Sequence, residues 1–321
     1  MPFTTPPRRY DILERFPALA EHAKTTVRLH PRAGRPGINE SSVGGPLLWP
    51  ADDPWPMCTL EHDVDSDDSY EEVLAMRGRF HEPDAGEERP GTFEQRQERS
   101  SDTTADLDPD APQPLVPLAQ LYYRDVPGLP WANRFDLLQI LWCPHDHPDT
   151  EPPYNPAFQL RWRKVDPGQP TLPSPPRPVT CYSEYVPNPC AVHPETITEY
   201  PNTVSLPEPL HQAVRDWQDE RGHLHWRNPT LAPGWKALGH GGRWGIINPY
   251  PIMCECGREQ LPLFTASSGE FGGGNSWHAV EDAGLDPRRT DPVEVTIGRG
   301  YSLQLYYCPE SEEHPNRTEM F

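Results

Sequence analysis

The sequence predicts an α+β protein that is mostly antiparallel β, with few helices and two related lobes from an internal duplication. The chain has 321 residues, of which 44 are proline and 23 are glycine. Because proline ends helices and is confined to turns and strand edges, we expect many short strands joined by stiff loops. A repeated motif and a series of strand-length apolar segments complete the case for this fold class.

Two motifs far apart in the chain resemble each other. VGGPLLWPADDPWPMC (43–58) and HGGRWGIINPYPIMC (240–254) each contain Gly-Gly, a Pro-aromatic-Pro corner and a terminal Met-Cys. Each is followed by a strand-like segment, and then by a Leu-Gln strand that ends in Cys-Pro, namely LLQILWCP and SLQLYYCP. The same features recur in the same order, which predicts an internal duplication.

Local patterns predict the other elements and the domain organisation. Helical spacing favours a helix over 10–24 with a break at Pro17, and a second helix near 207–222. We expect five parts: a first β-rich lobe (1–60 and 114–170), an acidic, Pro-rich flexible insertion with one weak helical turn (61–113), a connector (171–206), a helix plus the second β-rich lobe (207–309) and a tail (310–321).

The charge restricts the classes of partner. Lys and Arg number 28 against 48 Asp and Glu, a formal net charge of −20. This balance argues against nucleic acid and against a polybasic hold on membranes, and it permits a basic protein partner. The N-terminus lacks the apolar core of a secretory signal and the chain has an odd number of cysteines, 7. We therefore expect a cytoplasmic protein with reduced thiols.

Several segments together resemble a known family. They are VRLHPRAGRPG, SSVGGPLLWPADDPWPMC, PLVPLAQLYYRDVPGLPW, LLQILWCPHDHP, CAVHPETITEYP and the second-half block from GGRWGIINPYPIMCECG to YSLQLYYCP. This ordered set is similar to the YwqG-like proteins, a bacterial family of unknown function. The resemblance covers most of the chain except the acidic insertion and the two ends. It implies a bacterial, duplicated, sheet-rich α+β protein and brings no mechanism.

Cysteines and histidines of the first half have the spacing of metal ligands. Cys58 and His62 form a C-x3-H pair, and CPHDHP supplies Cys143, His145 and His147. If the corner and the strand end lie side by side, two sulfurs and two imidazoles could form a tetrahedral structural zinc site. The alternative is ordinary reduced cysteines beside loop histidines.

The second half offers fewer ligands. Cys254, Cys256 and Cys308 provide three sulfurs, and either His240 or His314 would have to complete the shell. The block CECG is also one residue shorter than the C-x-x-C-G usual in the YwqG-like family. The sequence therefore predicts one structural zinc in the first half, with the second half as a further candidate.

No motif specifies catalysis. The sequence contains no G-x-S-x-G elbow, no P-loop and no H-E-x-x-H. Candidates remain at Cys190 and His193, in CAVHPETITEYP, and at His278, in NSWHAVED. Each histidine has a carboxylate nearby in sequence that could orient a general base. Polar loop residues with local hydrogen bonds are the alternative.

We expect a non-enzymatic binding protein, of an immunity or regulatory type, that recognises a basic protein through an acidic, aromatic-rich surface. Two alternatives from other classes remain open. One is an enzyme with a Cys- or His-based site in a cleft between the lobes. The other is a zinc-stabilised structural scaffold.

Overall fold

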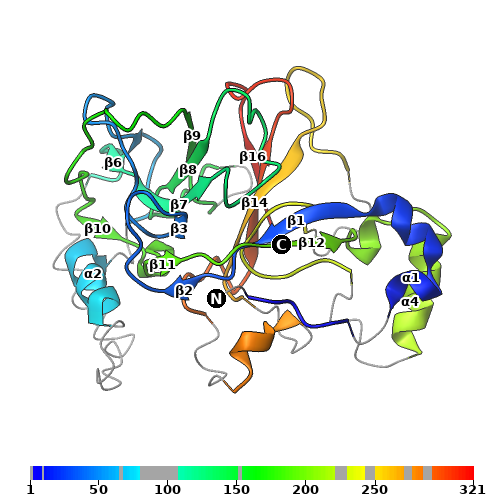
Figure 1. Cartoon of the computed structure of the whole chain (residues 1–321). Coiled ribbons are helices and arrows are strands. Elements are labelled where there is room, and N and C mark those ends of the chain that lie inside the picture. The colour runs from blue at the N-terminus through cyan, green and yellow to red at the C-terminus, as the bar shows by residue number, and fades with distance from the viewer. Residues whose placement is uncertain are drawn as a thin grey trace.

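The computed structural model of the chain describes residues 3–8, 11–64, 68–79, 108–150, 154–220, 230–242, 250–270, 277–284 and 291–321. Two six-stranded sheets dominate this part of the chain, and their strand pairings are antiparallel. Few helices accompany them (Figure 1). The prediction of a mostly antiparallel β protein with few helices is confirmed.

The first sheet has the strand order β2-β11-β3-β7-β8-β9. Its strands are β2 (Arg32–Ala33), β3 (Ser42–Val43), β7 (Val116–Tyr122), β8 (Leu137–Trp142), β9 (Phe158–Arg163) and β11 (Cys190–Ala191). The register between β7 and β8 shifts once, between Pro117 and Ala119. The same part of the chain also forms two short two-stranded sheets. In one, β4 (Met57–Cys58) pairs with β6 (Gln113–Pro114), and in the other β5 (Asp68–Ser69) pairs with β10 (Thr180–Cys181).

The second sheet has the order β12-β1-β13-β14-β15-β16. Its strands are β1 (Lys24–Arg28), β12 (Glu195–Glu199), β13 (Lys236–Leu238), β14 (Leu261–Ser267), β15 (Ser302–Tyr307) and β16 (Arg317–Met320). The pairing of β14 with β15 also shifts register once, between Pro262 and Phe264. Each sheet thus has one long strand pair whose register shifts next to a proline, as expected for a residue that cannot donate to the ladder.

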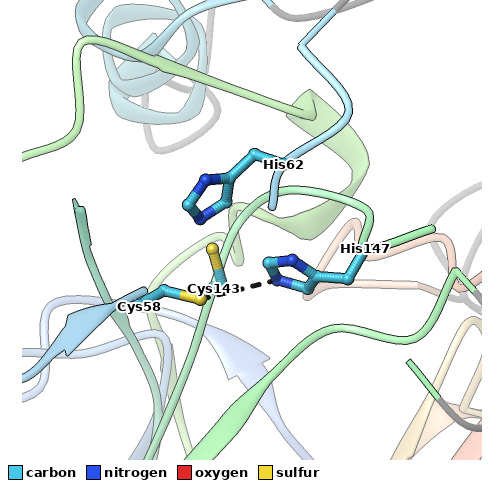
Figure 2. A group of neighbouring side chains, drawn as sticks. All are labelled: Cys58, His62, Cys143 and His147. Carbon is cyan, nitrogen blue, oxygen red and sulfur yellow. Dashed lines mark hydrogen bonds between the residues drawn. The ribbon is translucent and has the colours of Figure 1, made fainter. Parts of the chain in front are cut away.

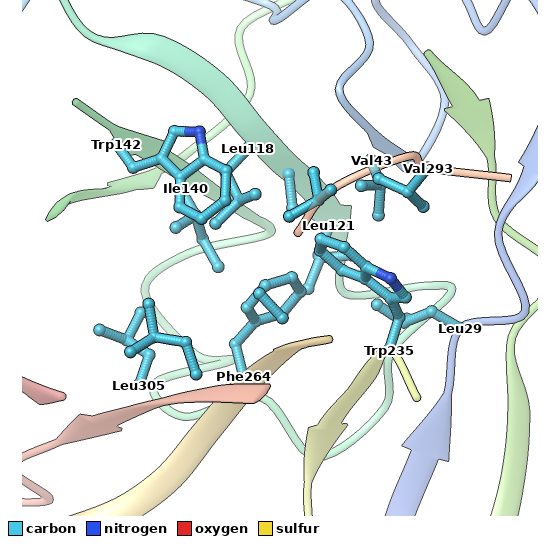
Figure 3. Packing of buried hydrophobic residues seen from close by; sticks show 14 of the residues in the cluster. Leu29, Val43, Leu118, Leu121, Ile140, Trp142, Trp235, Phe264, Val293 and Leu305 are labelled. Carbon is cyan, nitrogen blue, oxygen red and sulfur yellow. The ribbon is translucent and has the colours of Figure 1, made fainter. Parts of the chain in front are cut away.

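The two sheets share one hydrophobic core. Leu118 and Ile140 of the first sheet belong to the same buried cluster as Phe264 and Leu305 of the second. Figure 3 shows these side chains facing one another across the interior. At these residues the space between the sheets is filled by side chains, where the sequence analysis expected a cleft.

Most of the tryptophans that the structure describes lie in the interior, and the others are half-buried. Trp49, Trp142 and Trp235 are among the largest fully buried side chains. None of the tryptophans that the structure describes is exposed. The described tryptophans therefore contribute mainly to the core, and little to the aromatic-rich surface expected from the sequence.

The two predicted helical regions differ in their agreement with the structure. The region expected to be helical over 10–24 contains two short helices, α1 (Ile12–Arg15) and the 3-10 helix η1 (Pro17–His22). The Asp11 side chain caps α1 by accepting from the backbone N–H groups of Leu13 and Glu14. The break comes at Pro17, as predicted, because proline restricts the residue before it to non-helical conformations.

The helix expected near 207–222 is α4 (Leu210–Asp219). Its buried Val214 and Trp217 join Phe16 and Leu19 in a second, smaller core, and the rings of Phe16 and Trp217 meet edge to face at 5.9 Å. Figure 1 shows α1 and α4 side by side, far from α2. This satellite core fixes the N-terminal segment beside the second sheet.

The acidic insertion contains more structure than one helical turn. A ten-residue helix, α2 (Tyr70–Arg79), lies in it, with Tyr70 and Val73 buried in the core shared by the sheets. The Arg77 guanidinium donates to the backbone carbonyls of Ser183 and Val186. Residues 65–67 and 80–107 of the predicted flexible insertion lie outside the described residues, whereas its two ends are described and include His62.

Segments from several predicted parts meet in the second sheet. β1 lies in the range assigned to the first lobe and β12 in the connector, and both pair within the second sheet. Residues 310–321, expected as a tail, include β16, which pairs with β15. The remaining short elements are 3-10 helices: η2 (Ser183–Tyr185), η3 (Thr203–Ser205) and η6 (Val280–Asp282). No helix among the described residues has both the length and the apolar character needed to cross a bilayer.

Candidate metal centres

Four side chains of the first half converge at the edge of the first sheet. Cys58, His62, Cys143 and His147 are buried, and one ligand atom from each lies within 4.8 Å of the others. Figure 2 shows the four side chains pointing toward a common centre. Strand β4 supplies Cys58, the loop after it supplies His62, and the segment after β8 supplies the other two. Four of the five residues predicted as first-half ligands are thus brought together.

The Pro-Trp-Pro corner positions Cys58. The Trp55 ring packs on Trp49 at a centroid distance of 4.8 Å, and its Nε1 donates to the Leu115 carbonyl at 2.8 Å. The Leu115 N–H donates in turn to the Pro56 carbonyl at 3.1 Å. These contacts bind the corner to the start of β7, so that Cys58 and Cys143 share one small apolar cluster.

Backbone carbonyls orient both histidines. Nδ1 of His147 lies 2.8 Å from the Glu61 carbonyl, and Nδ1 of His62 lies 2.9 Å from the Pro109 carbonyl. Since a carbonyl can only accept, both Nδ1 atoms carry the proton and both Nε2 atoms present a lone pair. Nε2 of His147 lies 3.8 Å from Cys58 Sγ. Such an outer hydrogen bond is the usual support of a metal-binding imidazole.

The environment favours a thiolate at Cys58. A hydrogen bond from the Cys143 thiol is the main cause that lowers the pKa of the Cys58 thiol far below its usual value, although burial opposes this. The thiolate is the form of cysteine that binds metal. His145, also predicted as a ligand, is buried but stands outside the group of four, with its ring 5.1 Å from that of His62.

A second group forms at the edge of the second sheet. One ligand atom each from Cys254, Cys256, Cys308 and His314 lies within 4.8 Å of the others. Cys256 Sγ is 3.5 Å from Cys308 Sγ, and His314 Nδ1 is 3.2 Å from Cys308 Sγ and 3.6 Å from Cys254 Sγ. The sequence left His240 and His314 open as the fourth ligand, and the structure brings His314 to the group. Nε2 of His240 instead lies 2.8 Å from the His22 carbonyl.

A tight hairpin presents two of these cysteines. Met253 pairs with Glu259, the Cys254 N–H donates to the Arg258 carbonyl at 2.8 Å, and the Gly257 N–H donates to the Cys254 carbonyl at 2.9 Å. Gly257 has a φ of 84°, a left-handed conformation suited to glycine. The chain can therefore reverse direction directly after Cys256, although only one residue separates the two cysteines. The Cys256 N–H is the main cause that lowers the pKa of the Cys254 thiol to about 7.

Both groups fit zinc. With bonds of about 2.0 to 2.3 Å, tetrahedral ligands stand roughly 3.3 to 3.8 Å apart. The sulfur–nitrogen distance of 3.8 Å in the first group and the distances of 3.2 and 3.6 Å in the second lie at or close to this range. Two sulfurs with two imidazoles, and three sulfurs with one imidazole, are both donor sets of structural zinc sites.

The three catalytic candidates lie elsewhere. Cys190 is buried in β11, where burial raises the pKa of its thiol and its Sγ lies 3.3 Å from the Pro292 carbonyl. The His193 ring packs on Phe3 at 4.8 Å, and burial lowers the pKa of both His193 and His278. A thiol held in its neutral form is a poor nucleophile, so Cys190 is unsuited to nucleophilic catalysis.

A buried charged cluster, which sequence reasoning missed, lies beside these histidines. His30 Nε2 is 3.0 Å from Glu195 Oε2, and its Nδ1 is 3.5 Å from Glu270 Oε1. The Arg28 guanidinium is 3.6 Å from the same Glu270 oxygen. Burial lowers the pKa of His30 to about 4 and raises that of Glu270 to about 7. No local motif marks this cluster, because its members come from three separate segments, around residues 28–30, 195 and 270.

Comparisons with known proteins add no relative. No protein-family model matches the chain, and no curated protein matches it.

Proposed function

We propose that this protein is a zinc-stabilised scaffold that binds two zinc ions, one in each Cys/His group. The observation that carries the proposal is the convergence of four ligand atoms within 4.8 Å in both groups. In the first group, Cys58 and Cys143 would bind as thiolates, and His62 and His147 through Nε2. In the second, Cys254, Cys256, Cys308 and His314 would complete the shell. Bound zinc would act structurally, because four protein ligands leave no open position for a substrate.

Each ion would tie loops to the end of a central strand. The first would join β4 and its following loop to the segment after β8, and the second would join the 253–259 hairpin to the segment after β15. Such links would hold proline-rich loops against the sheets. The free energy of zinc binding would add directly to the free energy of unfolding.

We further propose that the two halves arose by duplication. β7 and β14 both carry a proline at their second position and a register shift beside it. β8 and β15 both carry a buried glutamine at their third position, Gln139 and Gln304, and both are followed by a ligand cysteine. The same ordered motifs support our proposal that the chain is a YwqG-like protein.

The net charge of the scaffold is the basis for a proposal about its binding partner. A net charge of −20 favours a basic protein as the partner of this non-enzymatic, immunity-type or regulatory protein. Capture on the immobilised chain, with salt elution as the readout, tests this. Failure to retain any basic protein at low ionic strength would contradict it.

Elemental analysis tests the metal sites directly. Protein purified without chelator should contain about two zinc ions per chain, Cys143→Ser and Cys308→Ser about one each, and the double variant none. Cys190→Ser is the matched control, because Cys190 is a buried cysteine outside both groups and should leave the zinc content unchanged. A metal-free wild-type chain that takes up no zinc on addition would contradict the proposal.

The buried charged cluster favours an enzyme as the second candidate function. His30 stands between two carboxylates and has a φ of 43°, a strained conformation for a non-glycine residue. Strained backbone and converging ionisable groups with shifted pKa values are typical of active sites. The shifted pKa of His30, about 4, would keep it neutral and able to accept a proton.

An activated ester tests this second candidate. Hydrolysis of p-nitrophenyl acetate should be at least about 100-fold slower in His30→Gln, the range expected for loss of a general base. The melting temperature and zinc content should be measured on the same sample, so that loss of fold is separated from loss of activity. Equal rates in the two proteins would leave the cluster a structural feature.

A further inference from the structure

The second metal group contains a thiol that solvent can reach. Six of the seven cysteines are buried, and Cys256 is the exposed one. It lies in the turn of the 253–259 hairpin, beside Gly257, which has open space around its Cα. Because oxidation of cysteine requires both an accessible sulfur and thiolate character, Cys256 in a metal-bound thiolate set is the cysteine most open to oxidants.

A partner for disulfide formation lies next to it. The Sγ atoms of Cys256 and Cys308 are 3.5 Å apart. A disulfide bond is about 2.05 Å long, so the two sulfurs need to approach by only about 1.5 Å. Because Cys256 is exposed, movement of the hairpin turn can bring its sulfur to Cys308 while the buried Cys308 stays in place.

We propose that the second group is a redox-responsive metal site, at which a hydroperoxide converts Cys256 and Cys308 to a disulfide and releases the metal. The inference rests on the proposed function, because it assumes that this group holds zinc. The oxidant is a peroxide, and the reverse step needs a dithiol reductant.

The reaction balances as two successive displacements. The Cys256 thiolate attacks one peroxide oxygen and becomes a sulfenic acid, and the other oxygen leaves as hydroxide. The Cys308 thiolate then attacks the sulfenic sulfur, which forms the S–S bond and expels a second hydroxide. Two protons convert both hydroxides to water. The two sulfurs lose two electrons in total, and hydrogen peroxide is reduced to two water molecules.

Zinc cannot remain after this step. The disulfide removes two of four ligands, and Cys254 and His314 alone do not make a closed site. In the first group all four ligands are buried, so the same oxidant should leave it intact. One molecule thus contains both the responsive site and its internal control.

Peroxide titration of the full-length, zinc-loaded chain tests the proposal. Zinc content is measured first, and a value of about two establishes the starting state independently of oxidation. Hydrogen peroxide should then release about one zinc per chain, detected with a colorimetric chelator, and peptide mapping should find one Cys256–Cys308 disulfide. Excess dithiothreitol followed by zinc should restore the content to two.

Two variants separate the thiol from the metal. Cys256→His keeps a metal-binding side chain and removes the exposed thiol, so it should bind zinc and release it at least about tenfold more slowly. Cys58→Ser should lack the first zinc and still release the second at the wild-type rate. Release of both ions, release of neither, or a disulfide between other cysteines would overturn the inference. A starting zinc content near zero would overturn the proposed function, while disulfide mapping would still show which cysteines pair.

Discussion

The two Cys/His groups follow strands with the same Leu-Gln pattern but differ in donors and in exposure. The first combines two buried thiols with two imidazoles that backbone carbonyls hold in place. The second uses three thiols and one imidazole, and Cys256 is exposed on a short hairpin. One sequence pattern, a cysteine after a Pro-aromatic-Pro corner and another after a Leu-Gln strand, therefore gives an enclosed site in one half and an accessible one in the other.

The difference comes from what surrounds the corner. In the first half, Trp49 and Trp55 cover Cys58 and share its apolar cluster. In the second half the corner residue Tyr250 is 59% exposed, whereas Trp55, at the corner of the first half, is half-buried. Burial excludes water and oxidants, so we expect the first site to hold the fold together and the second to respond to its environment.

The largest effect should come from breaking the first site. Cys143→Ser should lower the free energy of unfolding by about 4 kcal/mol, because it removes a structural metal and leaves a polar group in a buried cluster. Urea denaturation of zinc-loaded protein measures this. Cys190→Ser, a buried cysteine outside both groups, is the control and should cost far less. If both variants unfold at the same urea concentration, the first group is no more important to stability than an ordinary core cysteine.

A pH-dependent contribution separate from both metals should come next. Burial raises the pKa of Glu270 to about 7 in the folded protein. Between the ordinary value near 4.5 and 7, the unfolded chain has lost this proton and the folded chain retains it. The free energy of unfolding should therefore fall as pH rises through that window, by at most about 3 kcal/mol.

Glu270→Gln should remove that fall. Denaturation of wild type and variant between pH 4.5 and 7.5 gives the two slopes, and the variant's should be flatter. An unchanged slope would mean that Glu270 is ionised in the folded protein through its contact with Arg28. Because this effect acts at all zinc loadings, the two metal sites should be compared at one fixed pH.

Two neighbouring histidines test which imidazole is a zinc ligand in the first group. His147→Ala should weaken zinc binding at the first group by at least about 100-fold, because it removes a ligand. His145→Ala, two residues away and equally buried, should leave the affinity unchanged. Competition with a chelator of known affinity measures both. Equal losses would indicate that either imidazole can reach the metal.

The sequence predicted much of this arrangement for identifiable reasons. Strand-length apolar segments and the repeated motif located β7, β8, β14 and β15 and the cysteines Cys58 and Cys143 that follow their corners and ends. The sequence could not predict which of His145 and His147 is the metal ligand, because both lie in CPHDHP. Only the backbone path after β8 determines which imidazole faces the other ligands. His314 stayed open for a similar reason, since the contacts of Gln260 with the Pro315 carbonyl and the Arg317 N–H set its position.

Long-range pairing explains the larger omissions. β1 joins the second sheet, about 210 residues away in sequence, through pairs such as Thr26 with Leu238. Local propensity contains no information on such a partner. The docking of α2 was missed because two apolar residues, Tyr70 and Val73, hold it against the core in an otherwise acidic stretch.

The smallest effect should come from breaking the second site, and it completes the comparison. Cys256→Ser should lower the melting temperature of zinc-loaded protein by only about 2 °C, because the exposed hairpin can lose its metal while the core of the second sheet stays packed. Its zinc content should nevertheless fall by one ion, as for Cys143→Ser. Calorimetry and metal analysis on the same samples check both values. A loss of stability as large as that of Cys143→Ser would make the two sites energetically equivalent, and exposure would then not distinguish a structural site from a responsive one.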